Sequence, residues 1–138
     1  MQIRLALYLY NEEDTRIFGE GPYRLLCGVR ELGSLRAAAI QMGMAYTKAT
    51  KIIHRAEEEL GFPLTQRKIG GTKGGGSTLT PGAEELMKRY EACKEACHRA
   101  VEAIYDDCFS SFRPETFAPD GQPGTGEDHF AGSNAAKP

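Results

Sequence analysis

The amino-acid sequence predicts a mainly helical fold with a small amount of β-structure, and three patterns support that prediction. Apolar side chains recur at spacings of three and four residues over much of the chain between residues 25 and 108. Glycines follow several of these stretches, as they do at helix ends. A glycine-rich segment interrupts the pattern at residues 70–76. With 138 residues, of which 41% are hydrophobic and 26% charged, the chain has room for one domain and an appendage.

The first eighteen residues predict a β-hairpin. Residues 2–10 alternate with the period of two that a strand requires, and Asn11–Asp14 is a polar turn. Thr15–Phe18 can return as a short second strand. One side of the first strand carries Ile3, Leu5, Leu7 and Leu9.

Two helices are expected after this hairpin. The first follows Pro22, carries an apolar stripe and ends at Gly33. The second, from Leu35 to Met42, is rich in alanine and has Ser34 as its N-cap. The stripe of the first helix consists of Leu25, Leu26, Val29 and Leu32.

A third helix is expected to complete a helix-turn-helix. Gly43-Met44 ends the second helix, and the third runs from about Tyr46 to Leu60 before Gly61 closes it. The small side chains of Ala38 and Ala39 would let the second helix cross close behind the third.

A glycine-rich hairpin is predicted next, with strands at Leu64–Ile69 and Ser77–Leu79. Together with the three helices it makes a winged helix-turn-helix. Thr80 then caps a long helix that has Pro81 at its first position and runs to about Phe109, roughly 40 Å at 1.5 Å per residue.

The long helix carries a narrow apolar seam with heptad-like spacing. A helix with one narrow stripe has no core of its own, so we expect it to pair with the same helix of a second chain. Packing against its own domain is the alternative. The seam predicted for dimerisation consists of Leu86, Tyr90, Cys93, Cys97, Val101 and Ile104.

Three regions follow from these elements. Residues 1–82 are expected to form the winged domain and residues 83–109 the dimerisation helix. Residues 110–138 are expected to form a disordered tail, because residues 113–138 contain no Val, Ile, Leu or Met.

Charge is distributed unevenly along the chain, although the formal net charge is only −2. Residues 30–73 carry eight basic and four acidic side chains, a net charge of +4. Residues 84–107 carry a net charge of −3 and residues 113–138 one of −2. One basic zone in an acidic protein is a plausible footprint for phosphate groups.

This basic zone coincides with the winged helix-turn-helix, which predicts double-stranded DNA as the partner. The start of the third helix would enter the major groove, and the glycine-rich wing would approach the sugar–phosphate backbone. The residues predicted to contact DNA are Ser34, Arg36, Tyr46, Thr47, Lys48, Thr50, Lys51, Arg55, Arg67, Lys68, Lys73, Gly74 and Gly75.

The stretch Gly33–Ala39 resembles the first helix of the LysR-type DNA-binding domain. Three further stretches are Met42–Tyr46, Gly70–Gly76 and Leu79–Gly82, and they more closely resemble the N-terminal domain of the molybdate-dependent regulator (ModE) family. The resemblance covers about residues 2–105.

The resemblance implies a homodimer on a palindromic operator, with Tyr46, Lys48 and Lys51 facing DNA from the helix. It implies the same for Arg67, Lys73 and Gly74–Gly76 on the wing. Ala45 stands where the family usually has a serine N-cap, and Thr50 where it usually has tryptophan. The molybdate-binding domains of full-length members are not recognisable in this sequence, so neither molybdate binding nor any other cofactor is expected.

Three other functions remain open at this stage. Cys93 and Cys97 share a helical face, and together with a second chain they could bind a soft metal or sense redox state; Cys108 lies further along the same helix. Alternatively, the winged helix could bind another protein. An enzyme is not expected, because no nucleophile–base or paired-acid spacing is present. The sequence has no signal-peptide core or membrane-length apolar run, which predicts a cytoplasmic protein without a membrane partner.

Overall fold

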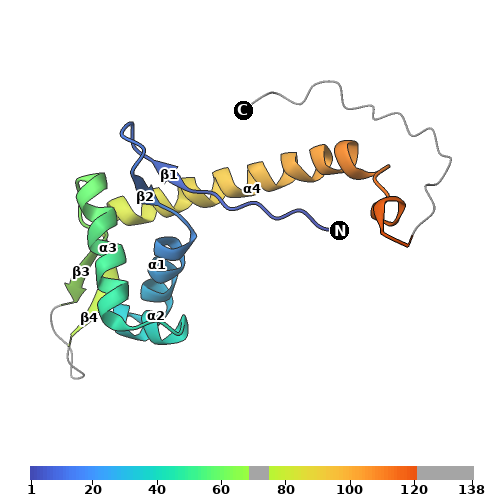
Figure 1. The fold of residues 1–138 in the computed structure, drawn as a ribbon. Helices are drawn as coiled ribbons and strands as arrows, with labels where there is room; N and C mark the ends of the chain where they lie inside the picture. The colour runs from blue at the N-terminus through green and yellow to red at the C-terminus, as the bar shows by residue number, and fades with distance from the viewer. Residues whose placement is uncertain (69–74, 121–138) are drawn as a thin grey trace. The chain divides into compact units, whose positions relative to one another are not determined.

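A computed structural model describes residues 1–68 and 75–120 of the chain. The chain divides into two compact units, one of Ala6–Lys94 and one of Met1–Leu5 with Glu95–Pro138. The elements in chain order are β1 (Leu9–Tyr10), β2 (Arg16–Phe18), α1 (Glu20–Leu32), α2 (Leu35–Gln41), α3 (Tyr46–Leu60), β3 (Thr65–Lys68), β4 (Gly76–Leu79), α4 (Pro81–Phe109) and the 3-10 helix η1 (Pro114–Phe117) (Figure 1).

The first unit is built around three helices that pack on one another, with β4 beside α1 (Figure 1). Phe18, Leu25 and Leu26 are at most 1% exposed and form the centre of its core. Helices α1 and α2 approach closely at Gly28, where an added Cβ atom would lie only 2.5 Å from the Cβ atom of Ala38. Ala38 and Ala39, predicted where α2 crosses α3, are both buried, and the close approach of Ala38 is to Gly28 of α1.

The helix ends follow the local chemistry of the sequence. The expected stop positions Gly33, Gly43 and Gly61 all have positive φ angles, of 70°, 65° and 81°. Glycine has no Cβ atom and adopts this conformation without strain. The Oγ atom of Ser34 accepts a hydrogen bond of 3.1 Å from the backbone N–H of Ala37, which confirms Ser34 as an N-cap.

The second hairpin pairs β3 and β4 in antiparallel register, with Thr65 opposite Leu79 and Lys68 opposite Gly76. Its second strand is docked on the end of α1, where the N–H of Ser77 donates a 2.8 Å hydrogen bond to the carbonyl of Gly33. A Cβ atom at Gly76 would lie 2.5 Å from that carbonyl oxygen, so only glycine permits this approach. Ile69 of the predicted first strand and Gly70–Gly74 of the predicted tip lie outside the described part of the chain.

The N-terminal strand is shorter than predicted. The alternation predicted a strand over residues 2–10, but only Leu9 and Tyr10 are paired, opposite Phe18 and Arg16. A strand needs a partner as well as an alternating pattern, and β2 has only three residues. The pairing partner therefore ends before it reaches residues 2–8.

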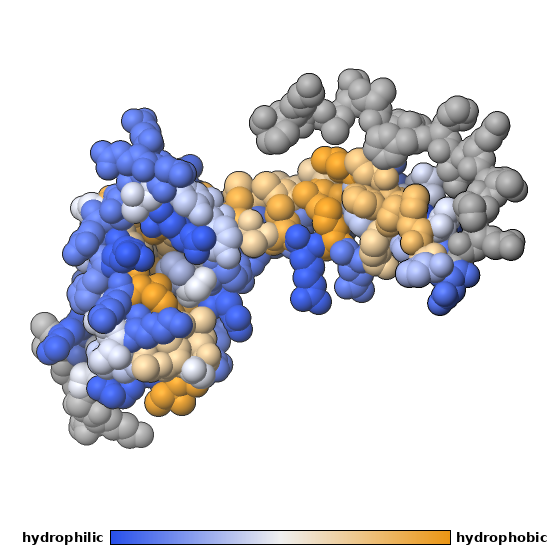
Figure 2. All heavy atoms as spheres, viewed as in Figure 1, coloured by the Kyte–Doolittle hydropathy of each residue, from blue (hydrophilic) through white to orange (hydrophobic). Residues whose placement is uncertain are grey.

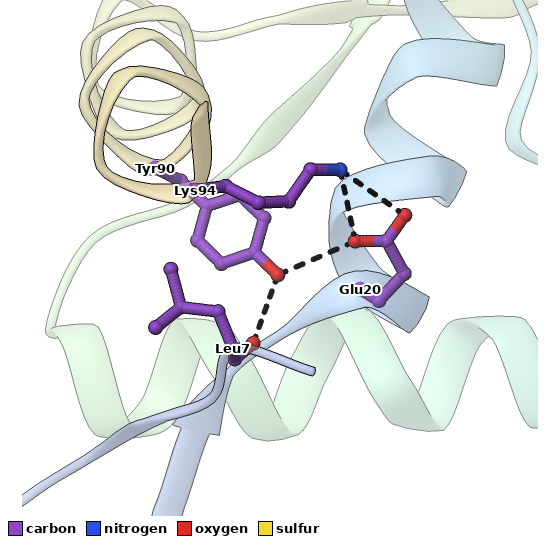
Figure 3. Close-up of polar contacts among 4 residues, drawn as sticks. All are labelled: Leu7, Glu20, Tyr90 and Lys94. Carbon is purple, nitrogen blue, oxygen red and sulfur yellow. Dashed lines mark hydrogen bonds and ion pairs between the residues drawn. The ribbon is translucent and has the colours of Figure 1, made fainter. Parts of the chain in front are cut away.

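Tyr90 anchors the start of α4 to the rest of the first unit (Figure 3). Its side chain is 2% exposed, and its hydroxyl donates a 2.9 Å hydrogen bond to the carbonyl of Leu7. The same hydroxyl lies 3.4 Å from a carboxylate oxygen of Glu20, which also pairs with Lys94 at 3.2 Å. Its ring packs edge-on against Phe18 at 5.2 Å. Burial, first of all, raises the pKa of Tyr90 to about 12.

These contacts correct the predicted dimerisation seam at its N-terminal end. Tyr90 is buried inside its own domain, and Leu86 packs against the same core. Heptad-like spacing indicates which face of a helix is apolar but not which neighbour covers it. Packing on its own domain, the alternative considered for the long helix, therefore applies to its first turns.

In the second unit, aromatic rings follow one another at the end of α4. Tyr105 stacks on Phe109 at 5.3 Å between ring centroids, and Phe112 lies 6.1 Å from both Phe109 and Phe117. The expectation of disorder from residue 110 onward is therefore wrong for η1. The prediction considered only aliphatic residues and Met, whereas phenylalanine supplies the apolar contacts here. Residues 121–138 of the expected tail lie outside the described residues.

Within residues 1–68 and 75–120, no helix combines the length and apolarity needed to cross a membrane.

Candidate nucleic-acid interface

Helix α3 has one buried and one exposed face at its N-terminal half. Ala49, Ile53 and Ala56 are at most 2% exposed and turn inward. Thr47 and Lys48 lie on the exposed face, and Lys51 continues it one turn later. A helix seated by small inward residues presents its polar side chains on a rigid support, as a recognition helix requires.

The start of α3 is braced by α2 and has no side-chain cap. Ala45 is the N-cap residue and makes no capping hydrogen bond, so the first N–H groups of α3 are not satisfied by a side chain at that position. The guanidinium of Arg36 lies 4.3 Å from the centroid of the Tyr46 ring. This cation–π contact brings two predicted DNA-contacting residues together at the turn.

Two other predicted residues use their hydroxyl groups inside the fold. The Oγ1 hydroxyl of Thr50 donates a 2.9 Å hydrogen bond to the carbonyl of Tyr46. The Oγ atom of Ser34 accepts the capping hydrogen bond described above. Thr50 therefore has its donor engaged within α3, whereas Ser34 still has its hydroxyl hydrogen available.

The predicted wing residues are distributed along the second hairpin. Arg67 and Lys68 are exposed on β3, and Gly75 is exposed just before β4. Lys73 and Gly74 lie outside the described residues. The docking of β4 on Gly33 places this hairpin next to the end of α1, within the same domain as α3.

Arg55, the last predicted residue on α3, lines a hollow of about 630 Å³ together with Lys48 and Lys51. Tyr8 and Arg16 line the same hollow, and the sequence did not predict either of them as a site residue. Only the folded chain brings them near α3, and no local motif marks them.

The cysteines of α4 do not form a metal site within the described part of one chain. No group of three or more His, Cys, Asp or Glu side chains placed to hold a metal ion occurs among residues 1–68 and 75–120. The pairing of Cys93 and Cys97 with the same residues of a second chain stays a prediction.

A helix-turn-helix with a docked β-hairpin wing defines a winged-helix domain of the DNA-binding type. Residues 23–84 match the family model described as "Bacterial regulatory helix-turn-helix protein, lysR family". This stretch begins within α1 and ends within the first turn of α4, so it includes both helices of the motif and the wing. Over residues 23–84 the chain is therefore similar to LysR-type helix-turn-helix domains.

Comparison with known proteins also confirms the resemblance to molybdate-dependent regulators. The chain is 35% identical over 68 residues to "Molybdenum-pterin-binding protein MopB" of Rhodobacter capsulatus, covering 49% of this chain and 25% of that protein. It is 30% identical over 84 residues to "Transcriptional regulator ModE" of Haemophilus influenzae, covering 61% of this chain and 33% of that protein. The chain thus spans between a quarter and a third of the length of these curated relatives.

Solved structures show the same fold. CbnR, a LysR family transcriptional regulator, superimposes with a TM-score of 0.50 at 20% sequence identity, over 64% of this chain and 29% of CbnR. The predicted fold, a winged helix-turn-helix with an N-terminal hairpin and a long C-terminal helix, is confirmed.

Proposed function

We propose that this protein is a cytoplasmic transcriptional regulator that binds a specific double-stranded DNA site as a homodimer. The observation that carries the proposal is the exposed face at the start of α3, where Tyr46, Thr47 and Lys48 follow the turn from α2. This half of α3 would lie in the major groove, which accommodates one α-helix. The name of one curated relative, the transcriptional regulator ModE of Haemophilus influenzae, supports a role in transcription.

The two kinds of side chain on this face would have different tasks. The hydroxyl of Thr47 and the ring of Tyr46 can contact base edges, which carry the sequence information. Lys48 and Lys51 add attraction to phosphate groups that does not depend on sequence. Arg67 and Lys68 of β3 would contact the backbone on the flank of the site, as a wing does.

The second half of the proposal is the dimer. Beyond Lys94, helix α4 presents Ile104 with 58% of its surface exposed, and Cys97 and Val101 lie on the predicted seam. Pairing of this part of α4 with a second copy would cover these side chains. Two recognition helices in one dimer would then read a palindromic site, because protein and operator share the two-fold axis.

The test is selection of bound genomic fragments, followed by gel-shift measurements at two salt concentrations. An enriched palindromic site with nanomolar affinity is expected, together with a steep loss of affinity as salt increases. Lys51→Ala should reduce the slope of log affinity against log salt by about 0.9 for each phosphate that the variant no longer neutralises. Lys88→Ala, which removes an exposed lysine of α4, is the matched control and should leave the slope unchanged.

If no site is enriched and affinity does not respond to salt, the domain binds something other than DNA. A protein partner would then be the better interpretation of the winged helix.

A further inference from the structure

The hollow between the first hairpin and α3 combines basic groups with an apolar interior. Its basic side chains are Arg16 of β2 and three from α3, namely Lys48, Lys51 and Arg55. Ile17, Phe18, Pro22 and Ile52 supply its apolar lining. Its volume of about 630 Å³ falls within the range of roughly 300–1,000 Å³ that is typical of small-molecule sites.

The positive charge of this hollow is not neutralised by the fold. Among the described residues that line it, none is acidic. The salt bridges formed within residues 1–68 and 75–120 involve none of its four cations.

Two carboxylates of α3 contact groups outside the hollow. Glu57 lies 3.2 Å from Nδ1 of His54 and accepts a hydrogen bond of 2.8 Å from the backbone N–H of Leu64. Glu59 accepts one of 2.8 Å from the side-chain amide of Asn11. Four like charges around one hollow repel one another, and an anion placed between them would relieve that repulsion.

One wall of the hollow is held in place by specific contacts. The Tyr8 ring lies so close to Gly19 that a Cβ atom there would be 2.5 Å from the ring. The guanidinium of Arg16 lies over the Tyr8 ring, 4.0 Å from its centroid. Arg16 also donates a hydrogen bond of 3.3 Å to the hydroxyl of Tyr10. The cation of Arg16 is thus positioned before any ligand arrives, which lowers the entropic cost of binding.

The apolar lining distinguishes this hollow from a surface that only touches DNA phosphates. Ile17 and Ile52 are only partly buried and line it together with Phe18 and Ala56, which belong to the buried core. The face of residues 6–94 drawn in Figure 2 is largely hydrophilic, with apolar atoms visible between the polar ones. A phosphate alone would leave an apolar lining uncovered, whereas an organic anion with a flat apolar body would cover it.

We propose that this hollow binds a small amphipathic anion, with its carboxylate, sulfonate or phosphate ester among the four cations and its apolar part on Ile17 and Ile52. Lys48 and Lys51 also belong to the proposed DNA-contacting face. Bound ligand would neutralise these lysines and compete with DNA, so the hollow is a site for an effector that releases the operator. This regulatory part rests on the proposed function, whereas ligand binding itself does not.

The probe is anilinonaphthalene sulfonate, which joins an aromatic body to one negative charge and fluoresces in apolar surroundings. The full chain should bind one dye molecule in a saturable manner. Phenylnaphthylamine, which lacks the sulfonate, should bind about tenfold more weakly, since it cannot form a hydrogen bond to a charged group. Arg16→Met and Lys51→Met should each weaken dye binding by a similar factor. Arg24→Met, an exposed arginine of α1 outside the hollow, is the matched control.

Equal binding of the charged and neutral probes, or dye binding unchanged in both Arg16→Met and Lys51→Met, would overturn the proposal. If a short duplex of arbitrary sequence displaces the dye, and the chain binds charged and neutral probes equally well, the hollow binds the DNA backbone instead.

A gel-shift titration on the selected operator separates the two claims. The dye should raise the DNA concentration needed for half-saturation in the wild type, and to a lesser extent in Arg16→Met. If the chain binds dye as expected but no DNA, the proposed function fails and the ligand site stands. If it binds both without competition, the effector role is wrong.

Discussion

Gly76→Ala is expected to loosen the wing from the domain, because β4 meets α1 backbone to backbone. The added Cβ atom would lie 2.5 Å from the carbonyl oxygen of Gly33, well short of the 3.4 Å at which ordinary contact begins. That oxygen belongs to a helix cap and has no rotamer to change. Relieving the clash must therefore separate the strands from α1 and break the 2.8 Å hydrogen bond from Ser77.

The cost follows from these two effects. Overpacking costs about 1–3 kcal/mol, and breaking a backbone hydrogen bond costs about 0.5–1.5 kcal/mol. We therefore expect the free energy of unfolding to fall by about 2–4 kcal/mol. Urea unfolding followed by circular dichroism measures this change, with the slope against urea concentration unaltered if the transition remains two-state.

The neighbouring glycine provides a matched control. A Cβ atom at Gly75 meets nothing within 4 Å, so Gly75→Ala should change stability by no more than about 0.5 kcal/mol. If the two variants unfold at the same urea concentration, the close approach of β4 to Gly33 does not hold the wing, and the reasoning is refuted.

Three further predictions concern other contacts of the same domain. Tyr90→Phe leaves the Leu7 carbonyl without its 2.9 Å partner and should cost about 1–2 kcal/mol in urea unfolding, whereas Tyr105→Phe, whose ring is stacked in the second unit, should cost far less. The pKa of Tyr90 is raised to about 12 from about 10 in the unfolded chain, so its contribution to the free energy of unfolding is complete below about pH 10 and is lost as pH rises toward 12. Between pH 10 and 12 the stability of Tyr90→Phe should therefore fall less steeply than that of the wild type, and identical pH profiles would contradict this. Ser34→Ala should destabilise the domain by about 1 kcal/mol because it removes a cap, and Ala45→Ser should stabilise it by a similar amount because it supplies a missing one. A higher melting temperature for Ser34→Ala, or a lower one for Ala45→Ser, would contradict the capping geometry.

Features set by neighbouring residues could be predicted from the sequence. A glycine after an apolar stripe ends a helix wherever the chain needs a positive φ angle, and this is confirmed at Gly33, Gly43 and Gly61. Ser34 accepts its capping bond from a residue three positions away, so the pattern and the contact occupy one short segment. The same locality explains why the helix-turn-helix was recognisable.

Features that need distant partners were predicted less well. The alternation of residues 2–10 was real, but the length of the strand depended on β2. The seam through Tyr90 was real too, but its cover came from Leu7, Phe18 and Glu20, more than sixty positions away in the chain. Hydrophobic periodicity identifies a buried face, and only the fold supplies the surface that buries it.

The two proposed surfaces of α3 show the same limit in a functional setting. Counting charge along the chain predicted a basic zone at residues 30–73, whereas residues 1–29 carry a net charge of −1. Folding brings Arg16 from that segment to the hollow that Lys51 and Arg55 also line, together with apolar side chains. The lysines of α3 thereby border two environments, open solvent where DNA would approach and a hollow where a small anion would fit. A phosphate backbone and an amphipathic anion both need these cations, and a cation neutralised by one is less available to the other. A protein whose recognition helix also lines a ligand site can therefore couple ligand binding to DNA release within a single domain.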